Sequence, residues 1–169
     1  EPSEWLGTPD KRYHLHLLSN QPRNKLHSQM DHGEHSLSIK IKGHEPVEIN
    51  PEDATARSIK NGDIVRVFND RGACICGAFI TEDVMPGVVI ISTGSWYDPD
   101  DPTDPSSMCK HGNPNMLSPD IGTSKLSQGP AAHSCLVEVE LYNGPPVTVT
   151  AYEPPEIIKI EDIGDSNDK

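Results

Sequence analysis

Short alternating or apolar runs dominate the hydrophobic pattern of the chain. Residues 13–19 alternate between polar and apolar positions and then become wholly apolar, as a strand that enters a core does. Similar runs predict strands at residues 46–49, 64–68, 73–80, 88–92 and 136–142, with a further one at 147–150. Residues 38–41 alternate more weakly. The pattern predicts a mainly β domain of six or seven short strands, closed into a small barrel with helical insertions.

Turn signals separate these strands and mark one helix. Asn50 suits an N-cap, Pro51 suits the first helical position, and two acidic residues follow where the helix dipole favours them. This arrangement predicts a helix from residue 51 to about residue 58. The sequence Asn-Asp-Arg-Gly at residues 69–72 lies between two predicted strands and is typical of a β-hairpin turn.

A long loop and two polar ends complete the predicted organisation. Residues 93–119 form a loop whose length favours a functional role. Because its acidic residues lack the glycine and closing glutamate of an EF-hand, we expect them to be solvated. These acids are Asp98, Asp100, Asp101 and Asp104. We expect residues 1–12 to be a linker, residues 13–151 the folded domain, and residues 152–169 an acidic, disordered tail.

Composition and charge exclude several classes of partner. The 169 residues suffice for one domain, and the 16 prolines and 13 glycines favour turns over long helices. The formal net charge of −12 argues against a broad nucleic-acid or anionic-membrane surface. No apolar run is long enough for a membrane span, so we expect no membrane insertion. A phosphate-rich ligand would therefore need a local group of hydrogen-bond donors.

The cysteines and histidines do not form a metal-binding or catalytic pattern. The four cysteines include no CxxC pair, and we expect ordinary buried thiols. His14 and His16 would share one strand face, but no cysteine or carboxylate stands beside them at ligand spacing. The sequence has no GxGxxG, GxxxxGK, GxSxG or HExxH motif and no Asp-Thr/Ser-Gly of an aspartic hydrolase. We therefore expect no catalytic residue and no metal ligand from this chain.

Two segments, residues 19–29 and 115–129, are poorly explained as plain scaffold. The run LHLLSNQP at residues 15–22, followed by KLHSQ at residues 25–29, resembles the start of the molybdopterin-dinucleotide-binding domain of the dimethyl sulfoxide reductase family. The resemblance is greatest to the branch that reduces trimethylamine N-oxide, dimethyl sulfoxide or biotin sulfoxide. Similar pieces follow in the same order at residues 43–47, 50–54, 62–67, 69–72, 96–97, 115 and 120–126.

The resemblance implies a more definite fold and ligand than the strand pattern does. It implies a six-stranded double-psi β-barrel with short helices and long loops, which binds bis(molybdopterin guanine dinucleotide) molybdenum. In this family the domain lies across the cofactor. Carried over by position, the cofactor contacts are Ser19, Asn20, Gln21, Pro22, Lys25, His27, Ser28, Gln29, Asn115, Ala132 and His133.

The chemistry of these residues suits pterin and guanine rings and phosphates. Lys25 can supply a charge-assisted contact to phosphate, and the amide of Asn115 can pair with a pterin edge as both donor and acceptor. Lys25 stands where the family often has arginine, which replaces a bidentate contact with a point charge. Gln21 stands where histidine is common, and Ala132 offers only its backbone.

The resemblance also implies the role of the chain in a larger enzyme. We expect it to be the C-terminal domain of a molybdenum reductase that removes oxygen from S- or N-oxides in a two-electron step, and not to be catalytic alone. Its partners would be the cofactor and the upstream domains, which supply the molybdenum ligand and most of the substrate site. Trp96 and Tyr97 would approach the substrate funnel or pack at the rim. A periplasmic location is favoured over a cytoplasmic one. The alternative is a free-standing barrel that acts as a binding or assembly module.

Overall fold

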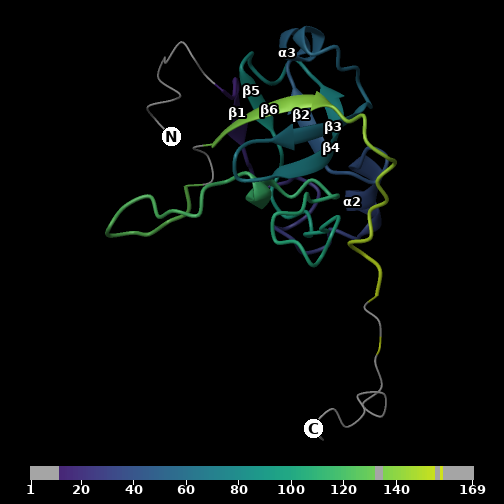
Figure 1. The fold of residues 1–169 in the computed structure, drawn as a ribbon, viewed down its shortest axis with the longest axis vertical. Helices are drawn as coiled ribbons and strands as arrows, with labels where there is room; N and C mark the ends of the chain where they lie inside the picture. The colour runs from purple at the N-terminus through teal and green to yellow at the C-terminus, as the bar shows by residue number, and fades with distance from the viewer. Residues whose placement is uncertain (1–11, 132–134, 155–156, 158–169) are drawn as a thin grey trace, which may run out of the picture.

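Six strands close into a barrel in this computed structural model, which describes residues 12–131, 135–154 and 157 (Figure 1). The order of neighbours around the barrel is β1-β5-β2-β4-β3-β6. The strands are β1 (Leu15–Leu18), β2 (Pro46–Ile49), β3 (Ile64–Phe68), β4 (Ala73–Ile80), β5 (Val88–Ile90) and β6 (Cys135–Leu141). The described helices are α2 (Glu34–Ile39), α3 (Pro51–Ala56) and the 3-10 turn η1 (Pro114–Met116). The predicted mainly β, six-stranded double-psi barrel with short helices and long loops is confirmed.

Two parallel strand pairs interrupt the antiparallel pairing of the barrel. β1 runs parallel to β5, with Leu18 opposite Ile90, and β2 runs parallel to β4. The β3–β4 hairpin is antiparallel, with Phe68 opposite Ala73, as the turn at residues 69–72 predicts. β6 pairs with both β1 and β3 and so closes the sheet on itself. Because β1 and β5 are parallel neighbours, their carboxyl ends and the loops that follow them meet at one end of the barrel.

Small aliphatic side chains and thiols fill the barrel. The fully buried core includes Leu15, Leu17, Val47, Ile49, Val65, Val67, Val89, Val137 and the cysteines Cys74, Cys76 and Cys109. All four cysteines are buried and none of them forms a disulfide, in agreement with the prediction of ordinary buried thiols. Within the described ranges, no group of three or more histidine, cysteine or acidic residues is placed to hold a metal ion.

The helix α3 begins as the sequence predicts. The Asn50 side chain accepts a hydrogen bond from the Glu52 amide at 2.9 Å, and Pro51 occupies the first turn. The helix ends at Ala56, two residues before the expected end, because Ser58 adopts a left-handed conformation (φ 57°) and Ile59 N–H bonds back to the Ala54 carbonyl.

Two of the weaker strand patterns do not form strands. Residues 38–41 include the end of helix α2, whose Leu37 N–H donates to the Gly33 carbonyl, and the apolar side chains of Leu37 and Ile39 are exposed. Alternation at this point therefore does not report burial. The predicted strand at 147–150 was also wrong, because Thr150 directs its hydrogen bonds to the Asp98 carboxylate and not to a neighbouring strand.

The same contacts correct the predicted tail boundary and part of the acidic loop. Asp98 is 5% exposed and accepts from Thr150 and the Ala151 amide, so it is not solvated. Tyr152, placed in the tail by the sequence pattern, packs against the domain through its hydroxyl. The packed domain therefore extends at least to Tyr152. The predicted linker up to residue 11, and most of the tail, lie outside the described residues.

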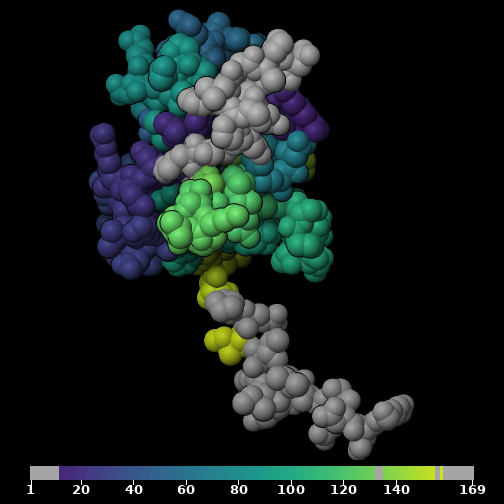
Figure 2. All heavy atoms as spheres, turned by 90° about the vertical axis from the view of Figure 1, so that its left-hand side faces the viewer, coloured from purple at the N-terminus to yellow at the C-terminus, as the bar shows by residue number. Residues whose placement is uncertain are grey.

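An arm formed by residues 119–131 leaves the body of the domain (Figure 1) and faces the viewer in Figure 2. It is held by bonds of its own, including Thr123 N–H to the Gly129 carbonyl at 2.8 Å and Gln128 N–H to the Ser124 carbonyl at 3.2 Å. Leu126 near its tip is 98% exposed. None of the helices in the described part of the chain is long and apolar enough to cross a membrane.

Candidate functional site

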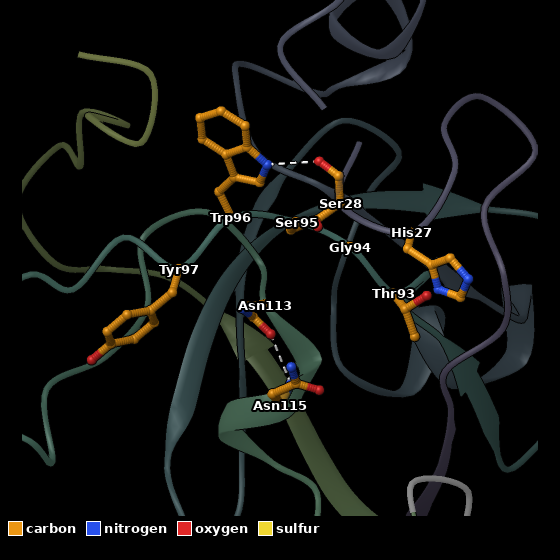
Figure 3. Close-up of a pocket in the computed structure, with 9 residues that line it drawn as sticks. All are labelled: His27, Ser28, Thr93, Gly94, Ser95, Trp96, Tyr97, Asn113 and Asn115. Atoms are coloured by element: carbon orange, nitrogen blue, oxygen red, sulfur yellow. Dashed lines mark hydrogen bonds between the residues drawn. The ribbon is translucent and has the colours of Figure 1, made fainter. Parts of the chain in front are cut away.

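An open pocket of about 460 Å³ lies where the loops after β1 and β5 meet (Figure 3). Its lining residues are His27, Ser28, Thr93, Gly94, Ser95, Trp96, Tyr97, Asn113 and Asn115. The parallel pairing of β1 with β5 brings the first two of these residues beside the next five, although more than 60 residues separate them in the chain. The pocket is therefore a product of barrel topology.

Backbone and side-chain bonds join the two loops directly after the strands end. Ser19 Oγ donates to the Ile91 carbonyl at 3.1 Å, and Thr93 N–H donates to the Asn20 carbonyl at 2.9 Å. Ser92 Oγ adds a bond of 2.9 Å to the Asn20 side chain. These contacts extend the β1–β5 pairing beyond the strands and hold the pocket floor in one position.

Gly94 allows the closest approach of the two loops. Its φ is +97°, and a Cβ added there would overlap the carbonyl oxygen of His27 and lie 3.0 Å from the Ser28 nitrogen. Any side chain at this position would separate the two loops. The pocket therefore requires glycine at this position. Only a residue without a Cβ adopts the positive φ angle without strain and leaves room for the His27 carbonyl oxygen.

Trp96 connects the pocket wall to the polar interior of the domain. Its indole Nε1–H donates to the Ser28 carbonyl at 2.8 Å, and its backbone N–H donates to Asp31 Oδ2 at 3.1 Å. In Figure 3 the indole lies beside Ser28, whereas the Tyr97 ring points away from the other side chains. Both rings are exposed, at 36% and 48%, so each presents an apolar face to solvent or to a ligand.

The third wall comes from the η1 turn. The Asn113 side chain accepts a hydrogen bond from the backbone N–H of Asn115 at 2.9 Å, which fixes the Asn113 side chain against the η1 turn (Figure 3). Asn69 fixes this turn to the barrel, because its Nδ2 donates to the carbonyl oxygens of Leu117 and Leu136. The hairpin turn that carries Asn69 therefore also supports the site.

Two hydroxyl groups of the pocket wall are buried without a partner. In the described part of the chain, Thr93 Oγ1 and Ser95 Oγ are the side-chain nitrogen or oxygen atoms that are buried and make no hydrogen bond. Both belong to lining residues of this one pocket. A buried hydroxyl that makes no hydrogen bond costs free energy, so its presence in a pocket wall points to a ligand that completes it.

Trp96 of the pocket wall is bonded through its backbone N–H to a buried cluster of four charged side chains, here called the lysine–acid cluster. Its members are Lys25, Asp31, Lys40 and Glu45. Lys25 Nζ lies 2.7 Å from Asp31 Oδ1 and 3.0 Å from Glu45 Oε2, and Lys40 Nζ lies 3.0 and 2.6 Å from the same two atoms. All four side chains are at most 1% exposed. Burial alone would raise the pKa of Asp31, but the hydrogen bonds and charges of the two lysines hold it well below its usual range.

This cluster changes the expected role of Lys25. The predicted contact to a phosphate needs an exposed ammonium group, but the Lys25 side chain is 0% exposed and faces two carboxylates. Its charge is therefore neutralised inside the domain, and only its backbone is accessible. Among the described residues that line the pocket there is no lysine, arginine, aspartate or glutamate.

Tyr152 fastens a C-terminal strap, residues 147–152, to the lysine–acid cluster. Its hydroxyl lies 2.9 Å from both Asp31 Oδ2 and His111 Nε2, and its ring stacks edge-on against Trp96 at 5.5 Å between centroids. Burial and the adjacent Asp31 carboxylate raise the pKa of Tyr152, so its hydroxyl stays protonated as a donor. The strap thus packs against Trp96 and supports the pocket wall that this residue forms.

The predicted contact residues are only partly brought together. His27, Ser28 and Asn115 line the pocket, and Ser19 and Asn20 lie at its edge through their bonds to residues 91–93. The remaining described residues of the prediction do not line it: Gln21, Pro22, Lys25 and Gln29. Ala132 and His133 lie outside the described residues.

Six further lining residues were not predicted as cofactor contacts. Trp96 and Tyr97 were expected at the substrate funnel or the rim, and the sequence did not single out Thr93, Gly94, Ser95 or Asn113. The run Thr-Gly-Ser at residues 93–95 follows the apolar strand β5 closely. Its place after this strand is the only hint of a site that the sequence offers for these residues. It becomes informative only when β5 is known to lie beside β1.

The buried histidines predict an acid-sensitive domain. Burial lowers the pKa of His44 and His111 from the ordinary value of 6.5. Because the folded state binds the proton less readily, these residues stabilise the fold above pH about 6.5 and lose that contribution as the pH falls below it. We expect a lower melting temperature at pH 5.5 than at pH 7.5 by differential scanning calorimetry. His111→Gln should reduce this difference, and a melting temperature independent of pH over this range would contradict the interpretation.

A family model and several reductases match this chain. The model described as the Molydopterin dinucleotide binding domain matches residues 15–136. The dimethyl sulfoxide/trimethylamine N-oxide reductase of Cereibacter sphaeroides is 46% identical over 156 residues, which are 92% of this chain and 19% of that protein. The trimethylamine-N-oxide reductase of Salmonella typhimurium is 50% identical over 150 residues, covering 88% of this chain and 18% of that protein. A biotin sulfoxide reductase from Cereibacter sphaeroides is 44% identical over 144 residues, which are 85% of this chain and 19% of that protein.

Structural similarity agrees with the fold. Acetylene hydratase from Pelobacter acetylenicus superposes with a TM-score of 0.63 over 78% of this chain and 19% of that chain, at 16% sequence identity. The chain spans about a fifth of the length of the curated relatives that it matches.

Proposed function

The chain belongs to the molybdopterin dinucleotide binding domain family, and on that premise we propose that it is the cofactor-closing C-terminal domain of a molybdenum reductase. We propose that the cofactor is bis(molybdopterin guanine dinucleotide) molybdenum. The parent enzyme would reduce a small S- or N-oxide such as trimethylamine N-oxide, dimethyl sulfoxide or biotin sulfoxide. The upstream domains would supply the metal ligand and most of the substrate site.

The pocket is the observation that carries this proposal. Three residues expected to contact the cofactor, His27, Ser28 and Asn115, line it together. Its hydroxyls, amides and imidazole are suited to the ring edges of pterin and guanine, which carry both donors and acceptors. The unpartnered hydroxyls show that the wall has hydrogen-bonding capacity left for a ligand. The donor set therefore fits a molybdopterin dinucleotide.

The residues of this chain would bind and orient rather than react. When bound, the cofactor supplies two-electron redox chemistry at molybdenum. The amide of Asn115 and the polar groups of His27 and Ser28 would hold its rings, while Trp96 would exclude water from that side of the site. We infer no proton transfer by these residues. Substitutions should therefore lower the amount of cofactor that the protein retains, while the turnover number per bound cofactor stays close to that of the wild type.

Cofactor content of the full-length protein tests the proposal. We expect Asn115→Ala to lower the molybdenum content, measured by mass spectrometry, and the pterin content, measured by fluorescence after oxidation, in equal proportion. A loss of about tenfold in affinity corresponds to one or two hydrogen bonds. Asn143→Ala is the matched control, because Asn143 is exposed and does not line the pocket.

Two outcomes would contradict the proposal. Absence of molybdenum and pterin from the wild-type full-length protein would exclude the reductase. A gene that encodes this barrel alone, without further reductase domains, would favour a free-standing binding module.

We also propose a periplasmic location. Respiratory N- and S-oxide reductases are usually periplasmic and the biotin sulfoxide branch is cytoplasmic. The higher identity to a trimethylamine-N-oxide reductase, 50% against 44% to a biotin sulfoxide reductase, supports the first. Cell fractionation followed by immunodetection tests this point, and recovery in the cytoplasm would contradict it.

A further inference from the structure

We propose that Thr93 and Ser95 form a binding element for an uncharged heterocyclic ring of the dinucleotide, through the amino-keto pyrimidine edge that pterin and guanine share. The pyrophosphate would then lie outside this pocket. The inference rests on the proposed function, but it assigns a ligand group to two residues that the sequence pattern did not single out.

The two hydroxyls have unmet hydrogen-bonding capacity. Ser95 is 3% exposed, and neither Ser95 Oγ nor Thr93 Oγ1 has a partner in the described part of the protein. Folding has therefore removed both groups from water without replacing their hydrogen bonds. A ligand with donors and acceptors at its edge would restore them.

The backbone of the segment that carries both hydroxyls is fixed in the pocket wall. Thr93 N–H donates to the Asn20 carbonyl at 2.9 Å, and Trp96 N–H donates to Asp31 Oδ2 at 3.1 Å. Gly94, between the two hydroxyl-bearing residues, packs against His27 too closely to admit a Cβ. The segment is held on both sides, so both hydroxyl-bearing residues keep fixed backbone positions in the wall and need little rearrangement to meet a ligand.

The pocket lacks the cationic side chains that a phosphate group would need. The lining residues that the structure describes include no lysine or arginine, and the ammonium groups of Lys25 and Lys40 are paired with Asp31 and Glu45. Phosphate sites usually provide a cation or several backbone N–H groups. Neutral hydroxyls, the amides of Asn113 and Asn115 and an exposed indole suit a flat, uncharged ring, and about 460 Å³ is large enough for a bicyclic one.

Two substitutions that remove only the hydroxyls test the inference. Thr93→Val and Ser95→Ala should each weaken binding of one ring probe, guanosine or pterin, by about three- to tenfold in the cofactor-free full-length protein. Binding of inorganic pyrophosphate should not change. The melting temperature of the ligand-free variants should stay the same or rise, because a buried group without a partner has been replaced by an apolar one. Titration calorimetry and differential scanning calorimetry give the two readouts.

Ser107→Ala is the matched control. Ser107 is also buried, at 8% exposure, but its hydroxyl accepts a bond from the Asp101 amide at 2.7 Å. This variant should lose stability without losing affinity for either ring. The opposite pattern, with affinity lost and stability kept, is expected only where the hydroxyl serves a ligand.

The outcomes separate this inference from the proposed function. A selective loss for pterin or for guanosine supports the inference and identifies the ring. Ring affinities unchanged by both substitutions, no ring binding by the wild type, or a lower melting temperature in both variants would overturn it. Cofactor retention by the wild-type protein would then leave the proposed function intact, whereas its failure to retain any dinucleotide would overturn the proposed function itself.

Discussion

Asp31→Ala should lower the free energy of unfolding by about 3–5 kcal/mol, because it breaks a buried ion cluster and leaves the opposite charges in place. The Asp31 side chain is 0% exposed, and its Oδ1 pairs with both lysines of the lysine–acid cluster. Without it, two buried ammonium groups would share the single carboxylate of Glu45. An unbalanced positive charge in a buried site is one of the few single changes with an effect of this size.

The second oxygen of Asp31 adds to the expected loss. It accepts from the Trp96 backbone N–H at 3.1 Å and from the Tyr152 hydroxyl at 2.9 Å. Its removal should therefore loosen the pocket wall as well as the C-terminal strap. We expect cofactor content to fall together with stability in Asp31→Ala, and Asp31→Asn, which keeps hydrogen-bonding atoms but not the charge, to fall between this variant and the wild type.

Urea denaturation followed by circular dichroism measures the stability. Glu140→Ala is the control, since Glu140 pairs with Arg66 at 3.0 Å but is 50% exposed, and a solvated pair contributes roughly 0–1 kcal/mol. Equal losses for Asp31→Ala and Glu140→Ala would show that the lysine–acid cluster is not a major source of stability.

The barrel could be predicted because its information is local. Alternating and apolar runs predicted all six strands close to their observed bounds, and Asn69 to Gly72 specified the hairpin between β3 and β4. The weak pattern at residues 38–41 failed because alternation reports a strand only when one face is buried, and Ile39 is 42% exposed. Strand positions thus followed from the sequence, while their neighbours in the barrel did not.

The site was predictable only where a family resemblance reached it. His27, Ser28 and Asn115 were expected and do line one pocket. Thr93 and Ser95 were missed because Thr-Gly-Ser after an apolar run is an ordinary turn until β5 is paired with β1. The same limit explains Lys25: its charge looks available in the sequence, but its partners Asp31 and Glu45 are 6 and 20 residues away, and only folding buries the three together.

Gly94→Ala should remove cofactor binding while the barrel persists. A Cβ at Gly94 would overlap the His27 carbonyl oxygen, which belongs to backbone and cannot rotate away, so the loops after β1 and β5 must separate. This separation would move His27 and Ser28 away from Thr93 and break the short bond between Trp96 Nε1 and the Ser28 carbonyl. Because a displacement of about 1 Å can cost on the order of 100-fold where several groups must act together, we expect a loss of that order.

Two other glycines separate this steric effect from backbone strain. Gly62 and Gly87 also have positive φ angles, +85° and +82°, but a Cβ at either position would meet nothing within 4 Å. Gly62→Ala and Gly87→Ala should therefore pay only the left-handed strain of about 1–2 kcal/mol and keep their cofactor. Molybdenum and pterin content of the three full-length variants, with circular dichroism to confirm the barrel, gives the comparison. Cofactor retained by Gly94→Ala, or lost equally by all three, would show that the close approach of the two loops does not build the site.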